Sequence, residues 1–127
     1  MRRFLFFLLT GFFAAAGSAA PLSPAARAEI DGLMSRLEVS GCEFNRNGTW
    51  HTAADAKSHL LRKLKYLEDR GAVQTAEQFI ELAASSSSTS GQSYLVRCGS
   101  GAPVPSSAWL TSQLQVMRSA GRAKNAP

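Results

Sequence analysis

The sequence predicts a small, helix-rich α+β domain with a short antiparallel sheet, made of a hairpin plus one strand and held by one disulfide. Three observations predict this class. Four segments carry apolar residues at the spacing of an amphipathic helix. Asn47-Gly48 lies between two short segments that suit strands and is a strong signal for a tight hairpin turn. Cys42 and Cys98 are the only 2 cysteines in the 127 residues.

The N-terminal segment predicts export. Arg2-Arg3 precedes a mainly apolar run of about 13 residues, and small residues follow before Pro21, which is the pattern of a secretory signal peptide. We expect residues 1–19 to be this signal peptide, with cleavage after Ala19. The apolar run is shorter than the roughly 20 residues that span a membrane, so no stable membrane insertion is expected.

Residues 20–119 are expected to form a single globular domain, and residues 120–127 a disordered tail. The chain has 14 Lys and Arg against 9 Asp and Glu. Removal of Arg2 and Arg3 with the signal peptide would leave a net charge of about +3, which is too small to predict nucleic-acid binding.

The two cysteines predict one disulfide, Cys42–Cys98, because an exported chain folds under oxidising conditions. A redox-active or metal-binding pair is the alternative. It lacks support, since there is no Cys-x-x-Cys and no histidine within a few residues of either cysteine. The disulfide would tie the hairpin to the later strand.

The first predicted helix starts at Pro24 and ends near residues 38–40. Ser23 is its candidate N-cap, and proline is favoured at the first helical position. Its apolar stripe consists of Ile30, Leu33, Met34 and Leu37.

Residues 40–51 predict the hairpin. A type I′ turn needs positive φ at both central positions, and Asn47-Gly48 tolerates this better than most pairs. A two-residue turn also fixes the register of the two strands. It places Phe44 opposite His51, Asn45 opposite Trp50 and Arg46 opposite Thr49.

Two further helices follow the hairpin. Thr52 is the expected N-cap of a long helix over residues 53–70, whose cations gather in the C-terminal half, where the helix dipole favours them. Thr75 and Gln78 have the spacing of a capping box and start a short helix that ends at Ala84.

The last part of the domain predicts one strand and one helix. Residues 85–90 are rich in serine and form either a flexible linker or a structured loop whose hydroxyl groups cap the backbone or contact a partner. Residues 94–98 predict a strand and residues 99–105 a loop. Ser106 or Ser107 is the expected cap of the final helix.

The motifs assembled so far are similar to those of a known family. They are Ser40-x-Cys42-x-Phe44-x-Arg46-Asn47-Gly48-x-Trp50, Ala56-x-x-His59-Leu60-x-x-Lys63, Glu77-x-Phe79-Ile80, Ser87-Ser88-x-Ser90-Gly91-x-x-Tyr94-x-Val96-Arg97-Cys98 and Trp109-Leu110. Over nearly the whole mature chain, the sequence resembles the YfeK-like family of bacterial exported proteins, defined by a domain of unknown function. The resemblance implies a periplasmic location and a single small domain, and it implies no activity.

The candidate binding surface combines cationic, aromatic and polar residues near the hairpin and the disulfide. Its members are Arg46, Trp50, His59, Ser90, Tyr94 and Arg97. Trp, Tyr and Arg dominate many binding surfaces but also fill cores, so both readings stay open. The basic helix over residues 53–70 either contacts anionic envelope material or is only solvated. The expected partner is an unknown protein or an anionic envelope component.

The sequence carries no catalytic signature, so we expect a non-enzymatic binding domain without metal or cofactor. The serine-rich tract lacks Gly-x-Ser-x-Gly and Ser-x-x-Lys. His51, Asp55 and His59 would share one stripe only if the helix began at His51, whereas the hairpin places His51 in a strand. A small hydrolase or a metal-binding protein remains an alternative.

A periplasmic lysozyme inhibitor is another alternative. Ser90-Gly91-Gln92-Ser93-Tyr94 is similar to the Ser-Gly-x-x-Tyr pattern of the periplasmic C-type lysozyme inhibitors. Those small exported domains resemble β-barrels, whereas most of this chain predicts helix.

Overall fold

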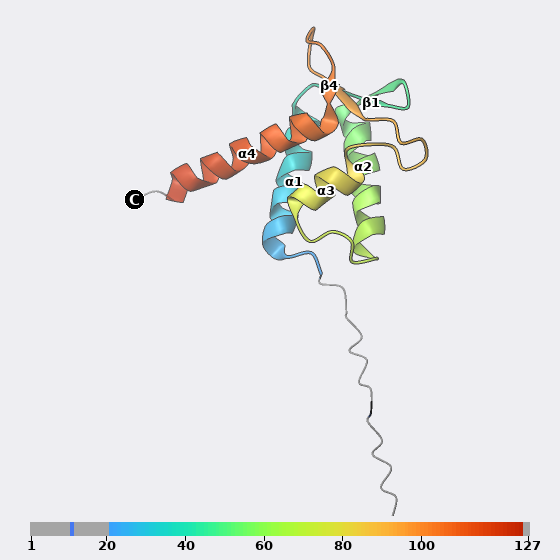
Figure 1. The fold of residues 1–127 in the computed structure, drawn as a ribbon. Coiled ribbons are helices and arrows are strands. Elements are labelled where there is room, and N and C mark those ends of the chain that lie inside the picture. The colour runs from blue at the N-terminus through green and yellow to red at the C-terminus, as the bar shows by residue number, and fades with distance from the viewer. Residues whose placement is uncertain (1–10, 12–20, 126–127) are drawn as a thin grey trace, which may run out of the picture.

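The computed structural model describes Gly11 and residues 21–125. In this part of the chain, four helices pack together and a four-stranded sheet lies at one end of α1 and α2 (Figure 1). The elements are α1 (Pro24–Val39), β1 (Glu43–Arg46), β2 (Thr49–Thr52), α2 (Ala53–Glu68), α3 (Ala76–Ala83), β3 (Leu95–Arg97), β4 (Val104–Pro105) and α4 (Ser106–Asn125). The predicted α+β class is confirmed. The expected signal peptide lies outside the described residues, apart from Gly11.

The three helix caps predicted before α1, α2 and α3 are confirmed. Each cap hydroxyl accepts a hydrogen bond from the backbone N–H three residues later, which satisfies one of the unpaired donors of the first turn. The bonds run from Ala26 to Ser23 over 3.1 Å, from Asp55 to Thr52 over 3.2 Å and from Gln78 to Thr75 over 3.1 Å. α2 ends at Glu68, earlier than the predicted residue 70.

The hairpin has the register that its turn predicts. Phe44 faces His51, Asn45 faces Trp50 and Arg46 faces Thr49. Asn47 and Gly48 have φ angles of 52° and 84°, as a type I′ turn requires. β1 also pairs antiparallel with β3, and the strand order is β2-β1-β3-β4.

Strand β4 lies where the sequence predicts a loop. Val104 and Pro105 pair with β3 at the edge of the sheet, the position in a sheet where proline is tolerated. Two residues are too short for a periodic pattern, so no sequence signal marks this strand. α4 begins at Ser106 directly after β4, and the Ser106 N–H donates to the Tyr94 carbonyl over 2.8 Å. Ser106 and Ser107 therefore lie within the helix instead of capping it.

Alternation along the strands gives the sheet two faces. Phe44 and Val96 face each other across β1 and β3 and are buried on the inner face, which packs against the helices. Asn45 and Leu95 form the next pair and point to the outer face. Trp50 faces Asn45 and so also belongs to the outer face.

The predicted disulfide joins β1 to β3. Cys42 and Cys98 are the next positions beyond the Glu43–Arg97 pair, and their Cα atoms are 4.2 Å apart. At the other end of the ladder, Arg46 and Tyr94 are the next positions beyond Asn45–Leu95. The disulfide thus holds the register that brings Arg46 and Tyr94 to the same inner face.

The hydrophobic core lies between the helices and the inner face of the sheet. α1 and α3 each pack against all of the other helices in this layer. The largest fully buried side chains include Tyr94, Phe44, Phe79, Ile30, Leu33, Met34, Leu37, Leu60 and Leu110. Among the described residues, no helix has both the length and the apolar character needed to cross a membrane.

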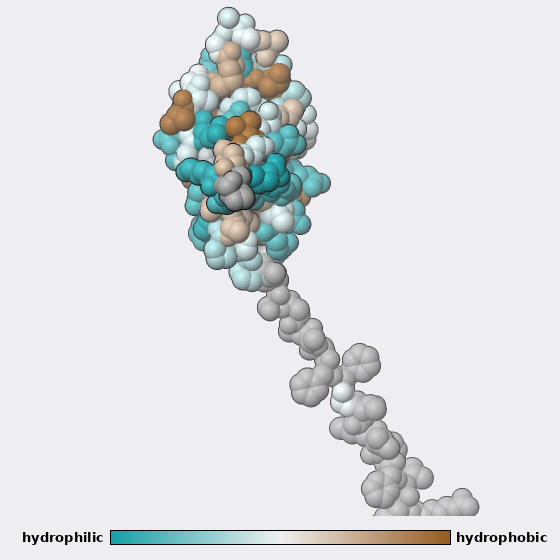
Figure 2. Space-filling view, turned by 90° about the vertical axis from the view of Figure 1, so that its left-hand side faces the viewer, coloured by the Kyte–Doolittle hydropathy of each residue, from teal (hydrophilic) through white to brown (hydrophobic). Residues whose placement is uncertain are grey.

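α4 is longer than predicted. Where the sequence predicts a disordered tail over residues 120–127, the helix continues to Asn125, and only residues 126–127 lie outside the described part. Ala, Arg and Lys favour helix in this stretch, and Arg122 and Lys124 suit the negative end of the helix dipole. This end projects from the body (Figure 1). Figure 2 shows the molecule from the side on which this end of α4 projects, and the surface there is mainly hydrophilic with separated hydrophobic residues.

We expect loss of the disulfide to destabilise the domain strongly. The cross-link joins residues 56 positions apart, and the chain-entropy account of such a loop gives about 4 kcal/mol. Replacement of both cysteines, Cys42→Ser with Cys98→Ser, should lower the free energy of unfolding by about this amount in urea titrations. A loss under about 1 kcal/mol would contradict this role of the bond.

Candidate functional site

Four polar side chains meet between the inner face of the sheet and α2. Arg46 ends β1, and Tyr94 immediately precedes β3. His59 and Lys63 are four residues apart on α2, which places them on one face of that helix. We call Arg46, His59, Lys63 and Tyr94 the donor cluster.

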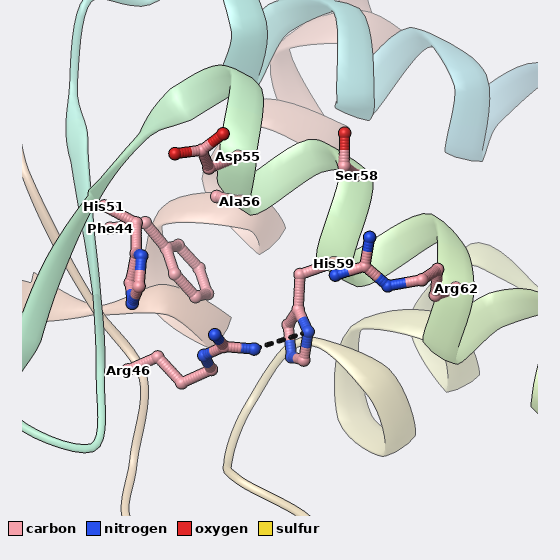
Figure 3. Close-up of a pocket in the computed structure, with 8 residues that line it drawn as sticks. All are labelled: Phe44, Arg46, His51, Asp55, Ala56, Ser58, His59 and Arg62. Atoms are coloured by element: carbon pink, nitrogen blue, oxygen red, sulfur yellow. Dashed lines mark hydrogen bonds between the residues drawn. The ribbon is translucent and has the colours of Figure 1, made fainter.

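Hydrogen bonds determine the tautomer of His59. Arg46 Nη1 lies 2.6 Å from His59 Nδ1, and the two side chains point toward each other (Figure 3). Because a guanidinium group can only donate, Nδ1 must accept, so the ring is neutral and carries its proton on Nε2. Nε2 donates to the Tyr94 hydroxyl oxygen over 3.2 Å.

Lys63 completes the network. Its Nζ donates to the Tyr94 hydroxyl oxygen over 3.2 Å and to the Ser86 carbonyl over 3.0 Å. The Tyr94 oxygen therefore accepts two hydrogen bonds. Within the described residues, the hydroxyl has no acceptor for its own proton. The donor cluster thus has donors in excess, and a negatively charged acceptor would satisfy them.

Burial and neighbouring charges keep His59 neutral. Desolvation, with further contributions from the Arg46 and Lys63 charges, lowers the pKa of His59 to about 4. Desolvation also lowers the pKa of Lys63, helped by the Arg46 charge. Desolvation raises the pKa of the Tyr94 hydroxyl. At neutral pH, the imidazole therefore separates Arg46 from Lys63 without adding a third positive charge.

Three cations at this site have no carboxylate partner among the described residues: Arg46, Arg62 and Lys63. Other cations of the domain do form ion pairs, namely Arg27 with Glu68, Lys57 with Glu38, Lys65 with Asp69, Arg97 with Glu43, and Arg118 with Glu29 and Glu77. Figure 3 shows the Asp55 carboxylate at the side of the cavity away from Arg46. Asp55 lines the same cavity as Arg46 and Arg62 but pairs with neither, so positive charge is in excess at the site.

Two cavities adjoin the donor cluster. The one in Figure 3 has a volume of about 220 Å³ and lies between β1, β2 and α2. The second, of about 500 Å³, lies between the hairpin and residues 87–89. Both are lined by Arg46, His51 and His59. Together they give the donor cluster a concave surface of the size that small-molecule sites have.

The serine-rich tract, residues 85–90, is a structured loop beside the larger cavity. The buried Ser87 hydroxyl accepts from the Thr89 and Ser90 backbone N–H groups, both over 3.3 Å. Asn47 Nδ2 donates to the same hydroxyl over 3.3 Å, and the Ser90 hydroxyl donates to Asn47 Oδ1 over 2.5 Å. Of the two alternatives from the sequence, the structured loop is therefore the one observed.

The candidate surface residues separate into two groups. Arg46, His59 and Tyr94 meet at the inner face, and Ser90 is close by through Asn47. Trp50 and Arg97 lie on the outer face instead. There the Arg97 guanidinium carbon is 4.0 Å from the centre of a Trp50 ring. The sequence predicts one surface, and the structure corrects this to two, because neighbouring strand positions point to opposite faces.

Lys63 and Arg62 belong to the site, although the sequence does not mark them as candidate surface residues. The spacing of His59 and Lys63 on α2 was a signal for Lys63, since residues four apart share a helix face. Its contact with Tyr94, however, depends on the tertiary fold. Arg62 carried no distinguishing signal among the many cations of α2.

Two other sequence patterns can now be placed. His51 lies in β2, and the described residues contain no group of three or more His, Cys, Asp or Glu that could hold a metal ion. In the Ser-Gly-x-x-Tyr pattern, Ser90 is exposed, whereas Tyr94 is only 1% exposed within the donor cluster.

Fold and site together define a small disulfide-linked α+β domain with a cationic cavity between its sheet and α2. The chain belongs to a family of unknown function, DUF5329, which it matches over residues 24–118. It is similar to "Uncharacterized protein YfeK" of Salmonella typhimurium, with 41% identity over 68 residues, 53% of this chain and 55% of that protein. The match thus spans about half of that relative. The resemblance to the YfeK-like family is confirmed, and no solved structure matches.

We expect the stability of the domain to fall as the pH drops from 6.5 towards 4. The ordinary pKa of histidine is 6.5, and that of folded His59 is about 4. Between pH 6.5 and pH 4 the imidazole binds a proton in the unfolded state but not in the folded state, so folding becomes less favourable as the pH falls through this range. Above pH 6.5 this group does not change the stability. The loss should be on the order of 1 kcal/mol, since solvent screens this partly exposed ring.

Urea unfolding of wild type and His59→Gln at pH 7 and pH 4.5 measures this effect. The variant should lose less stability than wild type over this interval, because glutamine does not titrate. Equal losses in the two proteins would contradict the assignment of the low pKa to His59.

Proposed function

We propose that this protein is an exported, non-enzymatic binding domain of the periplasm that recognises the anionic group of an envelope component. The observation that carries the proposal is the donor cluster with its surplus of hydrogen-bond donors. Arg46 and Lys63 bring positive charge to a cavity and have no carboxylate partner in the described chain. A carboxylate or phosphate would supply both the acceptor and the negative charge.

Binding is favoured over catalysis by the state of His59. Both of its ring nitrogens are engaged, Nδ1 by Arg46 and Nε2 by Tyr94. A general base needs a free nitrogen next to the group that it deprotonates. The imidazole therefore serves better as a neutral spacer that orients Arg46 and Tyr94 than as a base.

Export to the periplasm is supported by the disulfide, because such bonds persist in oxidising compartments. The predicted signal peptide supports the same location. The lysozyme-inhibitor alternative receives less support than anion binding, since Tyr94 of its short motif is buried and holds the donor cluster together.

We expect inorganic phosphate to bind at the donor cluster. In NMR titrations at low salt, backbone signals near residues 46, 59–63 and 86–94 should shift with saturation, because these segments line the larger cavity. Lys63→Met should reduce the affinity about tenfold, the usual order for loss of a charged hydrogen bond. Lys65→Met is the matched control, since Lys65 lies on the same helix and pairs with Asp69.

Added sodium chloride should weaken the phosphate binding, because salt screens the cations. Shifts spread evenly over the surface, or equal affinities for wild type and Lys63→Met, would contradict the proposal.

A further inference from the structure

A third cavity adjoins the 500 Å³ cavity beyond the donor cluster, and we call these two cavities together the groove. It has a volume of about 340 Å³ and shares His59, Lys63 and Ser88 with the 500 Å³ cavity. Arg62, Tyr66, Leu67 and Leu82 line the rest of it. The polar site is therefore continuous with a second site whose far walls are mostly apolar.

The groove follows one stripe of α2. His59, Lys63 and Tyr66 succeed one another at helical spacing on one side of the helix. At 1.5 Å per residue, the stretch from His59 to Tyr66 is roughly 10 Å long. Along this length the wall changes from cationic to apolar. Leu82, at the end of α3, faces the same cavity from a second helix.

The apolar end presents large side chains to solvent. Tyr66 is 57% exposed and Leu82 is 46% exposed. The guanidinium carbon of Arg70 lies 3.4 Å from the centre of the Tyr66 ring, and Arg70 Nη1 donates to the Tyr66 carbonyl over 3.0 Å. Arg70 thus holds one face of the ring. Exposed apolar residues around a cavity mark a ligand site more often than scattered ones do.

We propose that this groove binds a single-chain amphiphile with an anionic headgroup. The headgroup contacts the donor cluster, and Arg62 borders it, since Arg62 lines both the 220 Å³ and the 340 Å³ cavities. The chain lies along Tyr66, Leu67 and Leu82. This inference rests on the proposed function for its anion site and adds the class of ligand.

Charge complementarity selects this occupant. A neutral chain would leave Arg46, Arg62 and Lys63 without an ion-pair partner, since none of the three pairs with a carboxylate among the described residues. An anion without a chain would leave Tyr66 and Leu82 in water. A molecule with both parts satisfies both ends of the groove.

Three water-soluble probes below their micelle concentrations test the proposal by calorimetry on the disulfide-bonded protein. They are octyl phosphate, ethyl phosphate and octyl glucoside. Octyl phosphate should bind at least tenfold more tightly than ethyl phosphate, a gain that burial of about two methylene groups would supply. Octyl glucoside should bind at least tenfold more weakly than octyl phosphate, because it lacks the charge.

Two matched substitutions locate the chain. Leu82→Ser should weaken octyl phosphate about tenfold and leave ethyl phosphate unchanged, since only the chain reaches Leu82. Val116→Ser is the control, because Val116 is exposed to a similar degree, 48%, but lies on α4 and lines neither cavity of the groove. It should change neither affinity.

The outcomes separate this inference from the function on which it rests. If octyl and ethyl phosphate bind equally well, or if Leu82→Ser binds octyl phosphate as wild type does, the amphiphile proposal is overturned and the anion site stands. If octyl glucoside binds as tightly as octyl phosphate, the anionic headgroup is overturned. If neither phosphate binds, the proposed function fails as well.

Discussion

The register between β1 and β3 decides where the polar side chains of this domain lie. Along one ladder, Cys42 and Cys98 stand at one end, Phe44 and Val96 in the middle, and Arg46 and Tyr94 at the other end. All of these positions share the inner face. A shift of one residue would turn Arg46 to the outer face and separate it from His59. The disulfide opposes such a shift, because it fixes the partner of Cys42 covalently.

The donor cluster also depends on how α2 is rotated. Leu60 and Leu64 are buried in the core. His59 directly precedes Leu60 and Lys63 directly precedes Leu64, so both polar side chains lie at the border between core and solvent. The arrangement gathers like charges, which repel one another and cost stability. The low pKa of His59 limits this cost, since the ring stays neutral. Proteins tend to keep such unfavourable clusters where function requires them.

Apart from the disulfide between its two cysteines, the sequence predicts what is local and little of what is not. Caps and the hairpin register follow from a few adjacent residues, so Thr52 and Asn47-Gly48 could be interpreted correctly. The Lys63–Tyr94 contact joins segments distant in the chain, and β4 is too short to show a pattern. The separation of Trp50 from Arg46 could have been predicted. The same register places Trp50 opposite Asn45, whose side chain points away from that of Arg46.

The change of character along the groove restricts what can bind there. A purely apolar molecule would cover the donor cluster without offering an acceptor, and buried donors without acceptors are costly. A small anion alone would satisfy Arg46, Lys63 and the Tyr94 hydroxyl, yet it would leave the apolar walls formed by Tyr66 and Leu82 in contact with water. Because the two cavities share His59 and Lys63, the proposed ligand would have its charge and its chain directly joined. For the proposed amphiphile, the geometry of α2 would therefore set the order of its polar and apolar parts along the groove.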